Sequence, residues 1–151
     1  MCGIGAYIGD KKASSVLKGI IKDLEYRGYD SCGIATYFSG EIYCKKDVGK
    51  VDDVDFSFLE GNVGIAHTRW ATHGIVNHEN AHPHFDCNKK MYLVHNGIIE
   101  NSDELKKILK DHKFTSQTDS EVIVHLIEDF VNSGDLIEDA FVKCLKLLEG
   151  A

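Results

Sequence analysis

A cysteine stands directly behind the initiator methionine, in the opening stretch MCGIGAYIGD. If Met1 is trimmed, Cys2 carries both a thiol and a free α-amine. An unperturbed α-amine has a pKa of about 7.7–8.0, so part of it is neutral near pH 7 and can accept the thiol proton. Cys2 is therefore a candidate nucleophile that brings its own base. The opening stretch alone favours a simpler interpretation, a small residue at the start of a strand.

Three other short stretches carry groups that could bind a substrate. Arg69, in AHTRWATHG, could bind a carboxylate through two hydrogen bonds or form a surface ion pair. Asn96 and Gly97, in HNG, form either a tight turn, which the pair alone favours, or an oxyanion hole. Asp119, in QTDSE, either complements a helix N-terminus, which is favoured alone, or binds an ammonium group. Combined with a thiol, these groups describe a site that attacks the side-chain amide of free glutamine.

The stretch HENAHPHFDC is rich in possible zinc ligands, namely His78, His82, His84 and Cys87. Its spacing matches neither a paired Cys-x-x-Cys scheme nor a helical His-Glu-x-x-His motif. Ordinary loop histidines are the favoured interpretation, so we predict no metal site and no cofactor. A zinc-binding module built on these residues is kept as an alternative function.

Hydrophobic periodicity predicts an α+β protein. We expect strands at residues 3–8, 32–38, 41–46, 63–70 and 91–95, and helices at residues 12–26, 101–110, 118–132 and 135–149. Residues 71–90 show neither pattern and predict a long loop, while Thr118 and Glu121 match a capping box. Hairpin signals without strict strand–helix alternation favour a layered sandwich over a doubly wound parallel sheet.

Composition limits the partners and the compartment. A chain of 151 residues with 43% hydrophobic content is expected to form one domain. The formal net charge of -7 argues against nucleic-acid and anionic-membrane partners. We find no apolar run of about 20 residues and no signal peptide, so we expect a cytoplasmic protein. The five scattered cysteines indicate reduced thiols.

Six blocks occur in the order found in class II glutamine amidotransferases: MCGI, LEYRGYDS, GIAHTRWATHG, NAHPH, VHNGIIEN and TDSEV. The chain is similar to the members of that family that pass ammonia to fructose 6-phosphate, forming glucosamine 6-phosphate. The resemblance implies the four-layer αββα sandwich of the N-terminal nucleophile hydrolases. It also implies that Cys2 is the nucleophile and that Asn96 and Gly97 form the oxyanion hole.

The same resemblance implies how glutamine is held. Arg69 would bind its carboxylate and Asp119 its ammonium, with Thr72 and His73 lining the pocket. Supporting roles are implied for Arg27, Trp70 and His82.

In that family the domain continues with further strands and is followed by sugar-isomerase domains. We therefore expect residues 1–151 to be an incomplete glutaminase domain, truncated at its C-terminal end and without the sugar-isomerase domains. Open sheet edges would favour a homo-oligomer or a self-associating fragment. Two alternatives stay open within the family: the glutaminase domain of an amidophosphoribosyltransferase, and a fragment that is catalytically incompetent.

Overall fold

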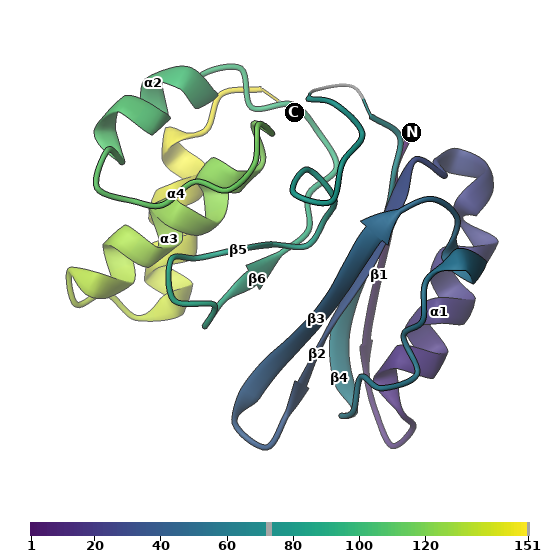
Figure 1. The fold of residues 1–151 in the computed structure, drawn as a ribbon. Helices are drawn as coiled ribbons and strands as arrows, with labels where there is room; N and C mark the ends of the chain where they lie inside the picture. The colour runs from purple at the N-terminus through teal and green to yellow at the C-terminus, as the bar shows by residue number, and fades with distance from the viewer. Residues whose placement is uncertain (72–73, 151) are drawn as a thin grey trace.

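The computed structural model describes residues 1–71 and 74–150 and contains two sheets (Figure 1). The larger sheet is antiparallel, with strand order β1-β4-β2-β3. Its strands are β1 (Gly3–Ile8), β2 (Ser31–Phe38), β3 (Glu41–Val48) and β4 (Val63–Arg69). The predicted hairpin is confirmed, because β2 and β3 pair around Ser39 and Gly40, whose φ angles are 51° and 91°.

Helix α1 (Ala13–Asp23) covers one face of this sheet. Its apolar residues recur at helical spacing, so Leu17 and Ile21 are both fully buried and pack with Ile34 of β2. The helix is shorter than the predicted range 12–26. It ends at Asp23 and is followed by a 3₁₀ turn at Glu25–Arg27, where the Lys22 ammonium and the backbone N–H of Val51 both bind the Glu25 carboxylate.

The opposite face of the larger sheet meets a two-stranded sheet, which is covered in turn by helices (Figure 1). These elements are β5 (His84–Phe85), β6 (Tyr92–Leu93), α2 (Ser102–Ile108), α3 (Glu121–Asn132) and α4 (Ile137–Leu147). A second hydrophobic core lies among them, centred on residues such as Val122, Leu126 and Cys144. The order α1, larger sheet, smaller sheet, α3 with α4 is the predicted α+β sandwich of four layers.

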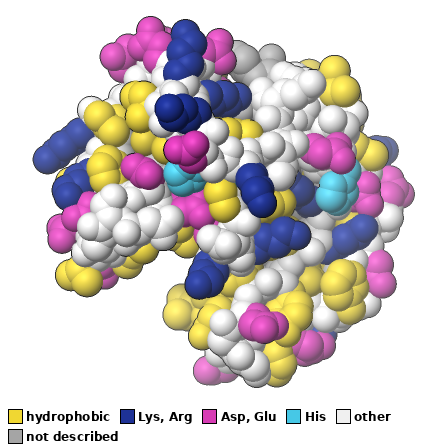
Figure 2. Space-filling model, turned by 60° about the vertical axis from the view of Figure 1, so that its left-hand side comes forward, with side chains coloured by type: hydrophobic (Ala, Val, Ile, Leu, Met, Phe, Trp, Pro, Cys, Tyr) yellow, Lys and Arg dark blue, Asp and Glu magenta, His cyan; other side chains and the backbone are white. Residues whose placement is uncertain are grey.

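Acidic, basic and hydrophobic side chains are interspersed on the face shown in Figure 2. A 3₁₀ turn at Val51–Asp53 completes the elements of the described residues. None of the helices in these residues has the length and apolar character needed to cross a membrane.

Three local predictions are wrong. The expected strand at residues 91–95 is reduced to the two residues of β6, and the expected loop at 71–90 contains β5. The capping box is absent: Thr118 Oγ1 meets His84 Nε2 at 2.9 Å, and no side chain caps the start of α3. Glu121 is fully buried and instead accepts the backbone N–H groups of Thr115 and Ser116, at 2.8 and 2.7 Å.

The larger sheet with α1 and the smaller sheet with α2, α3 and α4 form two halves of the molecule, here called the first and the second layer. The two layers join where residues 79–84 lie across the larger sheet. A Cβ atom on Gly33 would stand only 2.1 Å from the His82 carbonyl oxygen, so the segment can lie this close only over glycine. Lys46 is the cross-strand neighbour of Gly33 on β3 and is 5% exposed. Its ammonium donates to the carbonyls of Glu79, Ala81 and Pro83, at 3.2, 2.6 and 3.1 Å. All three donors of the ammonium are thereby satisfied.

A row of buried histidines occupies the same interface. The ring centroids of His67 and His82 stack 4.2 Å apart, and His82 meets His84 at another 4.2 Å. Burial lowers the pKa of His67 to about 4, that of His84 to about 3, and that of His82 well below its usual value. These rings are therefore neutral near pH 7.

Replacing Lys46 with methionine should loosen this interface. The Lys46→Met change removes the donor from two buried carbonyls and from the partly buried carbonyl of Glu79, and we expect the free energy of unfolding to fall by about 2–3 kcal/mol. Urea unfolding measures the loss. The control is Lys45→Met on the same strand, where a half-exposed ion pair with Asp47 is removed. Equal unfolding midpoints for the two variants would contradict the assigned role.

The buried histidines should also make stability depend on pH. Their folded-state pKa values lie below the unfolded value of about 6.5, so the unfolded chain binds more protons at acid pH. The stabilisation is complete above about pH 6.5 and is lost as pH falls toward the His67 pKa of about 4. We expect urea midpoints to fall from pH 7.5 to pH 5, and the fall to be smaller in His67→Asn. The control is His78→Asn, at an exposed site. The prediction would be contradicted if the fall were unchanged in His67→Asn but abolished in His78→Asn.

Candidate active site

Cys2 lies at the entrance of β1, beside the end of β4. The pairing of Gly3 with Thr68 brings the chain before β1 next to the chain after β4. The backbone N–H of Trp70 donates to Cys2 Sγ at 3.2 Å, and the thiol reaches the Trp70 carbonyl oxygen at 3.6 Å. Met1 is 80% exposed, which leaves the bond before Cys2 accessible.

The side chain of Asn96 reaches from the second layer to the backbone of Cys2. Its Nδ2 donates to the Cys2 carbonyl oxygen at 3.0 Å, and its Oδ1 lies 2.8 Å from His67 Nε2. Because the carbonyl needs a donor, the amide must present Nδ2 to Cys2 and Oδ1 to the ring. His67 is neutral and can supply the complementary N–H from Nε2. The buried ring therefore fixes which end of the Asn96 amide faces the thiol residue.

Arg69 and Asp119 place opposite charges near Cys2. Arg69 ends β4 and is 4% exposed, and its Nη1 donates to the Ile75 carbonyl at 3.3 Å. Burial lowers the pKa of Arg69, yet a guanidinium stays charged at neutral pH. Asp119 stands just before α3, 8% exposed, and accepts the Ile99 N–H at 2.7 Å. Both charges are held by backbone groups before any substrate arrives.

One small cavity joins most of the predicted site residues. It is lined by Cys2, Arg69, Trp70, His82, Asn96, Gly97 and Asp119. Its volume is about 40 Å³, close to the space that a single water molecule occupies. Glutamine is larger than this space, and the cavity is open to solvent on one side.

The remaining predicted residues are Thr72, His73 and Arg27. Thr72 and His73 fall outside the described residues. Arg27 is not part of the cavity lining; its Nη2 contacts the Met1 sulfur at 3.7 Å. The indole of Trp70 is 44% exposed and packs edge-on against Tyr29, with ring centroids 5.7 Å apart.

Sequence reasoning missed several residues that build the site. His95 and Ser120 line the cavity and are joined by a hydrogen bond of 2.9 Å. His67 is the partner of Asn96, and strand alternation could have found it, since it lies on the same face of β4 as Arg69. Asp30 fixes the end of β4 by accepting the Ala71 N–H at 2.9 Å and donating its own N–H to Arg69. No spacing rule pointed to Asp30.

The alternative zinc module does not form as predicted. His82 and His84 belong to the buried histidine row, and His78 is exposed. Cys87 lies apart from them, beside α3.

The chain matches the family model described as "Glutamine amidotransferase domain" over residues 1–135. It is 55% identical to a glutamine–fructose-6-phosphate aminotransferase (isomerizing) of Pyrococcus horikoshii, covering 100% of this chain and 26% of that protein. The enzyme of the same name from Staphylococcus aureus strain Mu50 is 49% identical, with the same coverage. The chain thus spans about a quarter of the length of these curated relatives.

Solved structures agree with the family match. A glutamine phosphoribosylpyrophosphate amidotransferase from B. subtilis, complexed with ADP and GMP, superposes with a TM-score of 0.82. An allosteric regulatory enzyme of purine biosynthesis gives 0.86. Both are 27% identical, and each match covers 100% of this chain and 34% of the other. From the family match over nearly its whole length, and from a shared fold, we conclude that this chain belongs to the glutamine amidotransferase domain family.

Proposed function

We propose that this chain hydrolyses glutamine to glutamate and ammonia, with Cys2 as the nucleophile once Met1 has been removed. One observation carries the proposal: the Cys2 thiol, the Asn96 amide, a buried cation and a buried carboxylate all border one cavity. Glutamine offers the matching groups, which are an amide to attack, a carboxylate and an ammonium. Glutamine would therefore use the thiol, the cation and the carboxylate of the site at the same time.

The first half-reaction forms a thioester. The free α-amine of Cys2 accepts the thiol proton, and the sulfur bonds to the amide carbon of glutamine. Negative charge then develops on the former carbonyl oxygen, where Asn96 Nδ2 and the Gly97 N–H can donate. The protonated amine returns its proton to the departing nitrogen as the C–N bond breaks. Ammonia leaves, and the γ-glutamyl group stays on Cys2.

The second half-reaction releases glutamate. The same amine takes a proton from water, and the hydroxide formed attacks the thioester carbon. The C–S bond breaks and the sulfur regains a proton. In both steps Arg69 would hold the α-carboxylate and Asp119 the α-ammonium, so the two ends of the substrate are fixed before the chemistry begins.

Trp70 is one of the exposed residues that line the cavity, and its backbone touches the thiol from both its N–H and its carbonyl. We propose that the Trp70 segment moves outward to admit glutamine and then closes over it. His82, His67 and Arg27 would support the two sides of the cavity.

For the whole protein we propose that the ammonia reacts with fructose 6-phosphate to give glucosamine 6-phosphate. The 55% identity to the Pyrococcus horikoshii enzyme supports this acceptor. A phosphoribosyl acceptor is the second candidate, supported by the solved structures at 27% identity. We also propose a cytoplasmic location, in keeping with five free cysteines, and self-association through the edge strands β1 and β3.

Removing the Asn96 amide should mainly affect turnover. Loss of one oxyanion donor typically lowers kcat by about 10²–10³-fold, and we expect this range for Asn96→Ala in a glutaminase assay. The control is Asn62→Ala, at an exposed position before β4. Kinetics in which Asn96→Ala and Asn62→Ala both match the unmodified chain would contradict the proposed oxyanion hole.

Shortening the Arg69 fork should mainly affect binding. Arg69→Lys keeps the charge but loses the bidentate contact, so we expect KM for glutamine to rise at least about tenfold. The matched measurement uses glutamine with its α-carboxylate converted to an amide. The variant should discriminate against that derivative less than the unmodified chain does. Unchanged discrimination would mean that another residue binds the carboxylate.

A further inference from the structure

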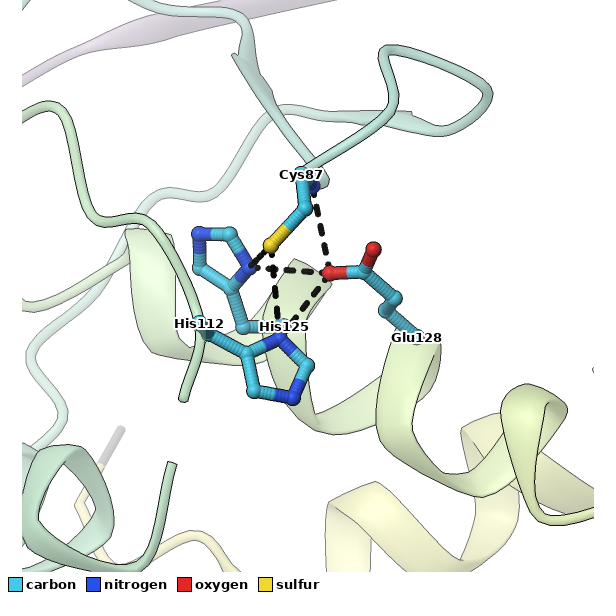
Figure 3. A group of neighbouring side chains, drawn as sticks. All are labelled: Cys87, His112, His125 and Glu128. Atoms are coloured by element: carbon cyan, nitrogen blue, oxygen red, sulfur yellow. Dashed lines mark hydrogen bonds and ion pairs between the residues drawn. The ribbon is translucent and has the colours of Figure 1, made fainter. Parts of the chain in front are cut away.

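Four side chains from three separate segments meet beside α3 (Figure 3). They are Cys87 from the turn after β5, His112 from the segment after α2, and His125 with Glu128 from one face of α3. Their possible ligand atoms all lie within 4.8 Å of one another. His125 and Glu128 are buried, whereas Cys87 and His112 are partly buried. None of the four lines the Cys2 cavity.

The distances between these atoms fit a tetrahedron around one small cation. Cys87 Sγ lies 3.6 Å from His112 Nδ1 and 3.7 Å from His125 Nδ1. Glu128 Oε2 lies 3.0 and 3.1 Å from the same two nitrogens. With ordinary Zn–S and Zn–N bond lengths, a tetrahedral site has S···N separations of about 3.6 Å and N···O separations of about 3.3 Å. These four separations therefore differ from the tetrahedral values by only a few tenths of an ångström.

The outer nitrogens of both imidazoles face carboxylates. His112 Nε2 lies 3.5 Å from Asp129 Oδ1, and His125 Nε2 lies 3.7 Å from Glu121 Oε1. Each imidazole has its Nδ1 beside Glu128 and its Nε2 near a second carboxylate, and His125 Nε2 is buried without a hydrogen bond. A cation bound to the two Nδ1 atoms would leave the one N–H of each ring on Nε2, the nitrogen nearer Asp129 or Glu121. Histidines that ligate metals commonly have such carboxylate partners.

Backbone groups orient the other two ligands. The Cys87 N–H donates to Glu128 Oε2 at 3.1 Å, and the Lys113 N–H donates to Cys87 Sγ at 3.3 Å. These two bonds hold the Glu128 oxygen and the Cys87 sulfur on the side that faces the two imidazoles. The thiolate and the Glu128 carboxylate together would balance a charge of +2.

We propose that Cys87, His112, His125 and Glu128 form a structural Zn²⁺ site. On binding, the Cys87 thiol releases its proton to solvent, and each imidazole binds through Nδ1 while keeping its proton on Nε2. Sulfur and nitrogen ligands select zinc over calcium or magnesium. Four protein ligands close a tetrahedral sphere, which leaves no position for a substrate.

The site would tie the turn after β5 and the segment after α2 to α3. Helix α3 begins at Glu121, two residues after Asp119, and the hydroxyl of its N-cap residue Ser120 binds His95 beside Asn96. Zinc would therefore hold the second layer in the arrangement that borders the Cys2 cavity, without taking part in the reaction there.

The experiment loads chelator-treated protein with Zn²⁺ or Co²⁺, removes unbound metal by gel filtration, and measures metal content. We expect about one ion per chain, and for Co²⁺ a tetrahedral visible spectrum with a sulfur-to-cobalt charge-transfer band. Cys87→Ser should lose that band, and Cys44→Ser should keep it. Asp129→Asn, which alters only the carboxylate behind His112, should weaken Zn²⁺ affinity about 10–100-fold.

Thermal unfolding gives an independent measurement. Zn²⁺ should raise the Tm of the unmodified chain and of Cys44→Ser, but not that of Cys87→Ser. If Cys87→Ser does not fold, the Co²⁺ spectrum of the unmodified chain still decides the question. The proposal is overturned if that spectrum lacks the sulfur band, if bound metal is far below one ion per chain, or if Cys87→Ser binds as the unmodified chain does.

Discussion

The close contact of residues 79–84 with Gly33 is the constraint on which the molecule depends. Because glycine leaves room for the His82 carbonyl, the segment can lie flat between Lys46 and His67. Lys46 binds the segment's carbonyls, and His82 stacks on His67. His67 in turn holds the Asn96 amide. The space left by Gly33 on β2 thus determines, through His82 and His67, how the Asn96 amide is oriented beside Cys2.

The candidate site draws on both layers, so neither layer alone contains it. Cys2 and Arg69 come from β1 and β4 of the larger sheet, whereas Asn96 and Asp119 come from the second layer. We therefore expect stability and activity to be coupled, because a change that separates the layers also separates Cys2, the proposed nucleophile, from Asn96, the proposed oxyanion donor. The buried histidines at the interface are neutral near pH 7, so they add no further charge to it.

Several parts of the fold and of the candidate site could be predicted from the sequence, and the physical reason differs from one part to the next. The larger sheet and α1 follow from local apolar periodicity, and Cys2, Asn96 and Asp119 follow from motifs whose parts stand close together in sequence. Two-residue strands such as β5 are set by tertiary contacts and leave no periodic signal. The Thr118 and Glu121 capping box failed because both side chains have buried partners elsewhere. The Cys87 cluster was missed because its ligands lie on segments far apart in sequence, which no spacing rule connects.

The central claim is that Cys2, with a free amine, is the nucleophile toward glutamine. The most direct test is intact-mass and peptide mass spectrometry after treatment with an electrophilic, thiol-directed analogue of glutamine. The account predicts a chain lacking Met1 that carries one adduct on Cys2, and protection of Cys2 by excess glutamine. Retained Met1 would contradict it, because the α-amine of Cys2 would then be tied up in a peptide bond. Labelling spread over the other cysteines, or unaffected by glutamine, would contradict it equally.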